Sequence, residues 1–167
     1  MLALLASSAA FGQIGRLQQL RLTRQDVIAA RPWSFPASAA PLLYGAALAA
    51  SSSAKTTAPV AGWPALLFAT AAAVSTHAAG NLVNTYVDYV RGDDDASSSD
   101  LTIVSGSMKP ARVLSLAVAA YGVAAGATAA LCTTSPAPTP LLLAMSTAGA
   151  TSAFAYTAGP GLKRRAL

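Results

Sequence analysis

Residues 63–95 read WPALLFATAAAVSTHAAGNLVNTYVDYVRGDDD, and this stretch decides the fold class because it is apolar for most of its length and acidic at its end. The apolar part, from about Trp63 to Val87, exceeds the roughly 20 residues that a helix needs to cross a bilayer. It does not alternate polar with apolar residues, as a strand of a membrane barrel would. The stretch therefore predicts a membrane-spanning α-helix with polar chemistry at one end.

Three further apolar segments predict three more spans, at about Phe35 to Ala50, Val113 to Cys132 and Pro140 to Ala158. The first is short for a span unless it extends into Ser51–Ser53. Of the 167 residues, 54% are hydrophobic and only 10% are charged, whereas soluble domains carry about 25% charged residues. The composition excludes a soluble or disordered chain and predicts an all-α, multi-pass transmembrane bundle of about four spans in a lipid bilayer.

Basic residues alternate between the ends of these spans, which predicts the orientation of the chain. They lie before the first span, after the second and after the fourth, with one in the first connection and none in the third: Arg16, Arg21, Arg24, Arg31; Arg91, Lys109, Arg112; Lys163, Arg164, Arg165; and Lys55. The positive-inside rule then places the N-terminus and the loop 88–112 in the cytosol. The net charge of +5 is explained by topology, so no nucleic-acid partner is expected.

Residues 1–30 are predicted to be a basic N-terminal lead-in. Within it, residues 16–31 mix arginines with apolar residues, which fits either a short amphipathic helix on the membrane surface or a solvated basic leader. Cys132 is the only cysteine, so no disulfide within the chain is possible.

Four polar residues interrupt the end of the second span: His77, Asn81, Asn84 and Asp88. Their spacing of 4, 3 and 4 places them within an arc of about 60° on one helix face. Polar groups inside a membrane are costly and normally face a bundle interior or a wet cavity. The stripe therefore predicts one wall of a polar cavity that opens towards the cytosol.

Five of the six acidic residues of the chain lie in positions 88–100. Carboxylates of this kind suit Mg²⁺, which proteins bind through one or two carboxylates together with substrate phosphates. The nearby Arg91, Lys109 and Arg112 could neutralise a diphosphate. Two plainer interpretations stay open: residues 93–99 as a solvated loop, and His77 as a hydrogen-bonded interior residue. Neither explains the stripe of polar residues within the span.

The residues 80–94, GNLVNTYVDYVRGDD, resemble the first Asp-rich motif of the UbiA prenyltransferase superfamily. Three shorter pieces agree with this family: RPWSF at 31–35, TIV at 102–104 and FAYTAG at 154–159. The similarity covers roughly residues 26–167. It identifies residues 31–167 as the N-terminal half of a UbiA-type domain, a helical membrane bundle around a central cavity.

The resemblance also implies a function. In this family Mg²⁺ bridges the motif carboxylates and an isoprenyl diphosphate, whose allylic carbocation is then attacked by an aromatic ring. By position in the motif, the expected catalytic residues are Asn84, Asp88 and Asp94, of which Asp88 and Asp94 are the metal ligands. Arg91, Asn81 and Lys109 are expected to bind the substrate diphosphate. The expected donor is geranylgeranyl diphosphate and the acceptor a naphthoquinone-type ring, as in menaquinone or vitamin K2 biosynthesis in an endoplasmic reticulum, Golgi or mitochondrial membrane.

The sequence departs from the family pattern at two places. Leu101 stands where the family usually has an arginine, and no Asp or Glu follows Asp100, so a second Asp-rich motif is missing. The chain is therefore expected to be an N-terminal fragment with little transferase activity of its own. Two alternatives to a transferase remain: a non-catalytic membrane module that binds isoprenoid diphosphates or other membrane proteins, and a small ion-conducting bundle.

Overall fold

The computed structural model describes residues 22–53 and 62–158, and every regular element in these ranges is a helix. The elements are α2 (Arg24–Ala30), the 3-10 helix η1 (Pro32–Ser34), α3 (Pro36–Ser53), α4 (Trp63–Arg91), α5 (Pro110–Thr134) and α6 (Thr139–Ala158). The all-α fold class predicted from the sequence is confirmed. Residues 1–21, which hold most of the predicted basic lead-in, lie outside the described part.

The four long helices coincide with the four apolar segments of the sequence. Two of them, α4 with 29 residues and α5 with 25, are long and apolar enough to cross a membrane. The first segment does extend through Ser51–Ser53, which gives α3 its 18 residues, and α6 has 20. Helix α4 continues to Arg91, so the whole polar stripe lies on one uninterrupted helix.

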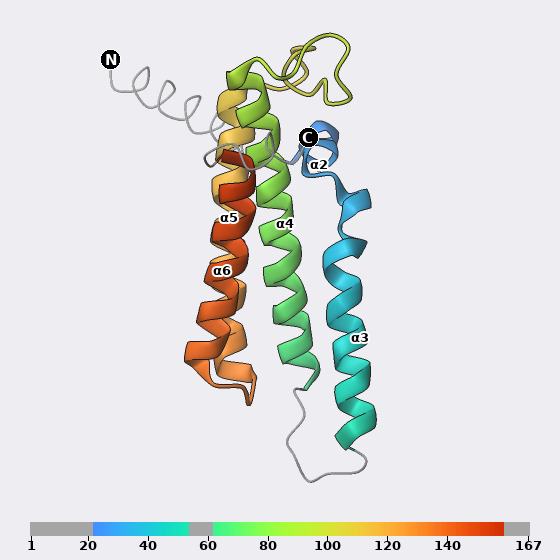
Figure 1. The fold of residues 1–167 in the computed structure, drawn as a ribbon, viewed down its shortest axis with the longest axis vertical. Helices are drawn as coiled ribbons and strands as arrows, with labels where there is room; N and C mark the ends of the chain where they lie inside the picture. Colours follow the sequence, from blue (N-terminus) through green and yellow to red (C-terminus); the bar gives the residue numbers. More distant parts are fainter. Residues whose placement is uncertain (1–21, 54–61, 159–167) are drawn as a thin grey trace, which may run out of the picture.

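Helix α4 is the centre of the bundle, with α3 on one side and α5 and α6 on the other (Figure 1). It packs most extensively against α5, and small buried residues recur along it every seven positions, at Ala65, Ala72 and Ala79. Buried residues of α5 repeat in the same way, at Ala117, Ala124 and Leu131. A seven-residue repeat keeps one seam facing the partner helix, and small side chains let the two backbones approach closely.

Helix α2 is fastened to the charged end of the bundle. Thr23 and Asp26 form a reciprocal capping box at its start. The carboxylate of Asp26, only 4% exposed, also accepts two hydrogen bonds from Arg112 on α5, at 3.1 and 2.7 Å. This two-point ion pair across 86 residues of sequence fixes how the chain enters the bundle.

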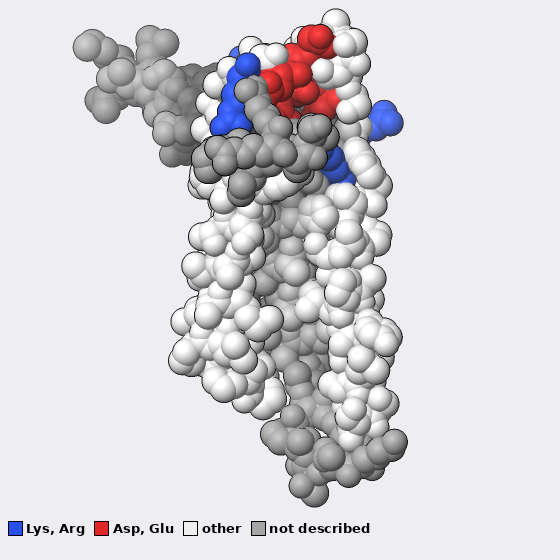
Figure 2. Space-filling view, viewed as in Figure 1, with Lys and Arg blue, Asp and Glu red and all other residues white. Residues whose placement is uncertain are grey.

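The connection between α4 and α5 folds back onto the same end of the molecule. Ile103 and Met108 from this loop are buried in a core cluster with Leu82, Val83 and Val113. The acidic side chains gather at this end, with basic side chains on either side of them (Figure 2). Below this end, the described residues on the face shown carry no charge.

Candidate active site

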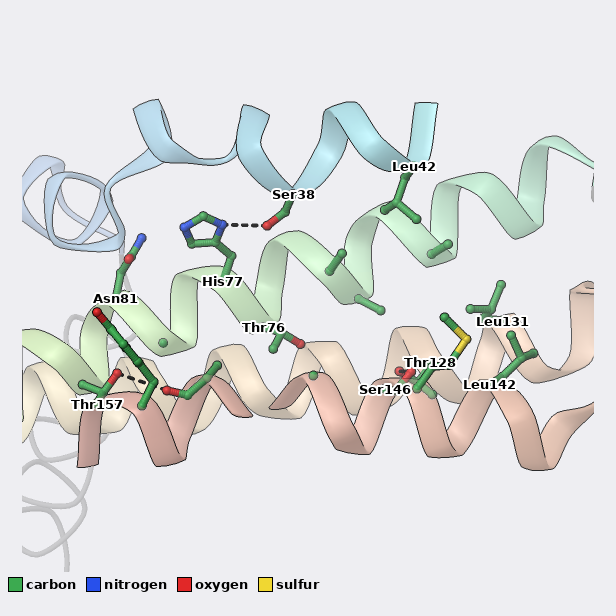
Figure 3. Close-up of a pocket in the computed structure, with 18 of the residues that line it drawn as sticks. Ser38, Leu42, Thr76, His77, Asn81, Thr128, Leu131, Leu142, Ser146 and Thr157 are labelled. Carbon is green, nitrogen blue, oxygen red and sulfur yellow. Dashed lines mark hydrogen bonds between the residues drawn. The ribbon is translucent and has the colours of Figure 1, made fainter. Parts of the chain in front are cut away.

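Three of the four residues in the polar stripe of α4 line a cavity of about 660 Å³: His77, Asn81 and Asn84. The cavity lies among α3, α4, α5 and α6, and its wall changes character along its length (Figure 3). One end carries polar groups that include Arg31, Asn81, Asn84 and Thr157; the other is lined by Leu42, Leu131, Leu142 and Met145. The cavity is thus suited to a ligand with a polar head and a long apolar tail.

Asp88, the fourth residue of the stripe, lies one helical turn beyond the cavity lining. The side-chain amide of Asn84 donates a 2.7 Å hydrogen bond to its carboxylate. Asp88 is only 7% exposed, although it lies near the end of a helix. The predicted catalytic pair Asn84 and Asp88 is therefore brought together by their i, i+4 spacing on α4.

The chain turns sharply after α4 and so keeps Asp94 at the same helix end. Gly92 has φ +72°, a left-handed conformation that glycine adopts without steric cost. The backbone N–H groups of Asp93 and Asp94 then return to the carbonyl of Asp88, at 2.8 and 3.4 Å. The half-buried Asp94 and the buried Asp88 consequently belong to one turn of chain.

The carboxylate of Asp100 forms contacts that hold the fold together. Its carboxylate receives hydrogen bonds from Arg31 at 2.6 Å, Thr85 at 2.6 Å and the backbone of Thr102 at 3.0 Å. Burial opposes ionisation of this carboxyl, but hydrogen bonds from Thr102, Thr85 and Arg31 outweigh it and lower the pKa to about 2. Asp100 therefore fastens the loop to α4 and to the segment that precedes η1.

Arg31 was noted in the sequence only as part of a motif and a topology signal, yet the structure places it at the site. It lines the polar end of the cavity, and it connects α2 to η1 with φ 56° and ψ 58°. This left-handed conformation costs a residue with a Cβ roughly 1 kcal/mol or more, so the surroundings must hold it. The ion pair with Asp100 is one such restraint.

The residues predicted to bind a diphosphate are not all directed to one point. Arg91 donates to the backbone carbonyls of Thr157 and Ala158 at the end of α6, both at 3.2 Å. Lys109 is the exposed N-cap residue of α5. The amide nitrogen of Asn81 donates to the Ala30 carbonyl at 2.9 Å and to the Ser34 hydroxyl at 3.1 Å. Of the three, Asn81 alone lines the cavity.

The donor set at the end of α4 fits a hard divalent cation in its chemistry. Asp88 and Asp94 offer carboxylate oxygens, as Mg²⁺ prefers. In the described ranges no group of three or more His, Cys, Asp or Glu side chains could hold a metal ion. Two carboxylates match Mg²⁺ only when the oxygens of a bound phosphate or water complete its shell.

Fold and site together define a helical bundle of membrane type, with an amphipathic cavity that ends at an acidic helix terminus. The model of the UbiA prenyltransferase family matches residues 38–167. The chain belongs to the UbiA prenyltransferase family.

The comparison with curated proteins agrees with this assignment. The chain is 40% identical over 142 residues to UbiA prenyltransferase domain-containing protein 1 of Gallus gallus, which covers 84% of this chain and 41% of that protein. The Homo sapiens protein is 39% identical over 142 residues, which make up 84% of this chain and 40% of that protein. The Drosophila melanogaster homolog is 38% identical over 147 residues, which make up 84% of this chain and 38% of that protein. The chain thus spans about 40% of the length of these relatives. No solved structure gives a significant match.

Proposed function

We propose that this chain contributes the donor-diphosphate half of a membrane prenyltransferase site, in which an isoprenyl group passes from its diphosphate to an aromatic acceptor. The observation that carries the proposal is the polarity of the cavity, which runs from apolar side chains to Asn81 and Asn84 and ends one turn before Asp88. An isoprenyl diphosphate has the same distribution of polarity. Binding would bury its tail and leave the diphosphate at the acidic end.

We assign a separate role to each residue of the site. Asp88 and Asp94 would hold Mg²⁺, and the ion would supply positive charge to stabilise the departing pyrophosphate. Asn84 would orient the Asp88 carboxylate through its 2.7 Å hydrogen bond. Arg91, Asn81 and Lys109 remain our proposed contacts for the diphosphate. Because Arg91 and Asn81 already bind backbone carbonyls, each would have to use further donors or exchange partners.

The further details follow from the family resemblance. We propose geranylgeranyl diphosphate as donor and a naphthoquinone-type ring as acceptor, hence a role in menaquinone or vitamin K2 biosynthesis. The protein would be a multi-pass protein of an intracellular membrane, of the endoplasmic reticulum, Golgi or mitochondrion, with its N-terminus in the cytosol. Other membrane proteins are possible partners.

Binding of the donor tests the proposal directly. Purified chain should bind geranylgeranyl diphosphate in Mg²⁺ and lose most of that affinity in EDTA. Asp88→Asn, which keeps the size of the side chain and removes its charge, should weaken binding in Mg²⁺ at least tenfold. Asp95→Asn is the matched control, because Asp95 is exposed and, among the described residues, its carboxylate bonds only to Ser97 and Ser98 of its own loop. Equal affinities of wild type and Asp88→Asn in Mg²⁺ would refute the site.

A non-catalytic binding module is the competing function, and the share of the relatives' length that the chain covers makes it a specific alternative. Transfer to menadiol, the reduced naphthoquinone ring, separates the two. Prenylated product that disappears in Asp88→Asn supports the transferase, whereas Mg²⁺-dependent diphosphate binding without product supports the module.

A further inference from the structure

The only histidine of the chain lies between two serines at the wall of the cavity. The Nδ1 atom of His77 is 2.7 Å from the Ser38 hydroxyl on α3, and its Nε2 atom is 3.1 Å from the Ser34 hydroxyl in η1. The ring of Phe35 meets the imidazole edge-on, with 5.8 Å between centroids. Binding of a donor diphosphate makes no use of this arrangement.

The surrounding hydrogen bonds decide which nitrogen of His77 carries the hydrogen. Ser34 donates its single hydroxyl hydrogen to the carbonyl of Arg31, at 2.7 Å, and it accepts from Asn81. Towards His77 the same oxygen then accepts a further hydrogen bond, which assigns the ring hydrogen to Nε2. In a neutral imidazole Nδ1 is then an acceptor, and Ser38 must donate to it.

Of the two serines that bond to His77, one lines the cavity and the other does not. Ser38 and His77 both line the cavity, and Ser34 is not part of its lining (Figure 3). In the described part of the chain, Nδ1 of His77 is the one hydrogen-bond partner of the Ser38 hydroxyl. A hydroxyl oxygen that donates its hydrogen can still accept. Ser38 therefore presents the cavity with an acceptor whose own hydrogen is already used.

The position of this acceptor distinguishes between the two substrates of a prenyltransferase. His77 precedes Asn84 by seven residues, which places it about 10 Å deeper along α4 than the proposed diphosphate end. An isoprenyl tail has no hydrogen-bond donor at that depth. A hydroxylated aromatic ring that lies beside the first carbons of the tail has one.

We infer that Ser38, held in place by His77, binds a ring hydroxyl of the aromatic acceptor. The inference rests on the proposed transferase function and adds an acceptor subsite to it. It also implies a preference for the reduced ring. A hydroquinone or phenol donates its O–H to Ser38, whereas the carbonyl of a quinone can only accept and would face an oxygen with no hydrogen to give.

Because the chain has a single histidine, ¹⁵N-labelled histidine gives one imidazole to observe by NMR in detergent or nanodiscs, with a purification tag that lacks histidine. The free protein should show the Nε2–H tautomer. Menadiol, kept reduced, should shift the Nδ1 resonance in a saturable way, and the corresponding quinone, menadione, should not. An Nδ1 resonance that stays fixed as menadiol is raised to saturation overturns the inference, as does an equal response to both compounds.

Variants test the same subsite without relying on spectroscopy. Ser38→Ala should weaken menadiol binding about tenfold, the effect of one lost hydrogen bond. Ser115→Ala is the matched control, because the Ser115 hydroxyl on α5 bonds to the carbonyl of Arg112 and is not part of the cavity lining. It should bind menadiol as wild type does. Equal losses in both variants, or none in Ser38→Ala, would contradict the subsite.

Donor binding keeps this test separate from that of the function. If Ser38→Ala binds geranylgeranyl diphosphate normally in Mg²⁺ and loses menadiol, both proposals are supported. If wild type binds the diphosphate and gives no menadiol response, the acceptor subsite fails and the donor site stands. If the diphosphate does not bind wild-type protein in Mg²⁺, the transferase function itself fails, and the acceptor subsite fails with it.

Discussion

The guanidinium of Arg31 lies 2.6 Å from the carboxylate of Asp100, although 69 residues of sequence separate them. This ion pair joins the segment before α3 to the loop after α4, and it holds a residue with an unfavourable left-handed backbone at the polar end of the cavity. The side chains are 29% and 14% exposed, so solvent screens the pair only in part.

Removing the charge of Asp100 should therefore destabilise the protein. We expect Asp100→Asn to cost about 2 to 3 kcal/mol of unfolding free energy, because it leaves the charge of Arg31 without its partner. Thermal and denaturant unfolding in detergent measure this cost. Asp95→Asn, in the exposed part of the same loop, should leave the stability unchanged. A stability of Asp100→Asn equal to that of Asp95→Asn would show that the ion pair does not restrain Arg31.

The same carboxylate predicts a pH dependence. The pKa of Asp100 is lowered to about 2 in the folded protein, below its ordinary value of 3.8. Above that ordinary value both folded and unfolded states are ionised, and the full stabilisation is present. As the pH falls from about 4 to about 2, the unfolded state takes up the proton first, so stability is lost. Between pH 5 and pH 2, the free energy of unfolding should fall less steeply with decreasing pH in Asp100→Asn than in wild type.

Substitutions of Arg91 and Lys109 should distinguish a residue that both stabilises the fold and binds the diphosphate from one that acts on the diphosphate by charge alone. Arg91 donates to the last described carbonyls of α6, so Arg91→Ala should cost about 1 kcal/mol of stability through lost hydrogen bonds. It should also weaken Mg²⁺-dependent diphosphate binding. Lys109→Ala should weaken that binding without a change in unfolding. If Arg91→Ala alters stability and leaves diphosphate affinity as it was, Arg91 only anchors α6.

The two ends of α5 should lie on opposite sides of the membrane, because its 25 residues extend about 37 Å and the hydrocarbon core is about 30 Å thick. In a Cys132→Ser background, Ser99→Cys reports on the loop before α5 and Thr139→Cys on the turn after it. In sealed microsomes a membrane-impermeant maleimide should label Ser99→Cys at once and Thr139→Cys only after detergent. Labelling of both, or of Thr139→Cys alone, would reject the proposed orientation.

The sequence by itself determined the helices and the polar face of α4. Apolar length predicted all four long helices, and the 4, 3, 4 spacing predicted that His77, Asn81, Asn84 and Asp88 share one helix face. The cavity lining includes the first three of these residues and not Asp88. Both properties depend on the local period of one helix and need no knowledge of its neighbours. For the same reason the i, i+4 contact of Asn84 with Asp88 was within reach of the sequence.

Only the tertiary structure decided which groups complete that face. Arg31, which pairs with Asp100, and the two serines that bond to His77 all come from residues 31–38, more than 35 positions away. Arg91, which belongs to the same Asp-rich motif, bonds to the end of α6 and does not line the cavity. Spacing along a chain carries no information on such pairs, because they depend on how helices pack against one another. The same packing brings side chains of α3 and α6 to the cavity that α4 lines.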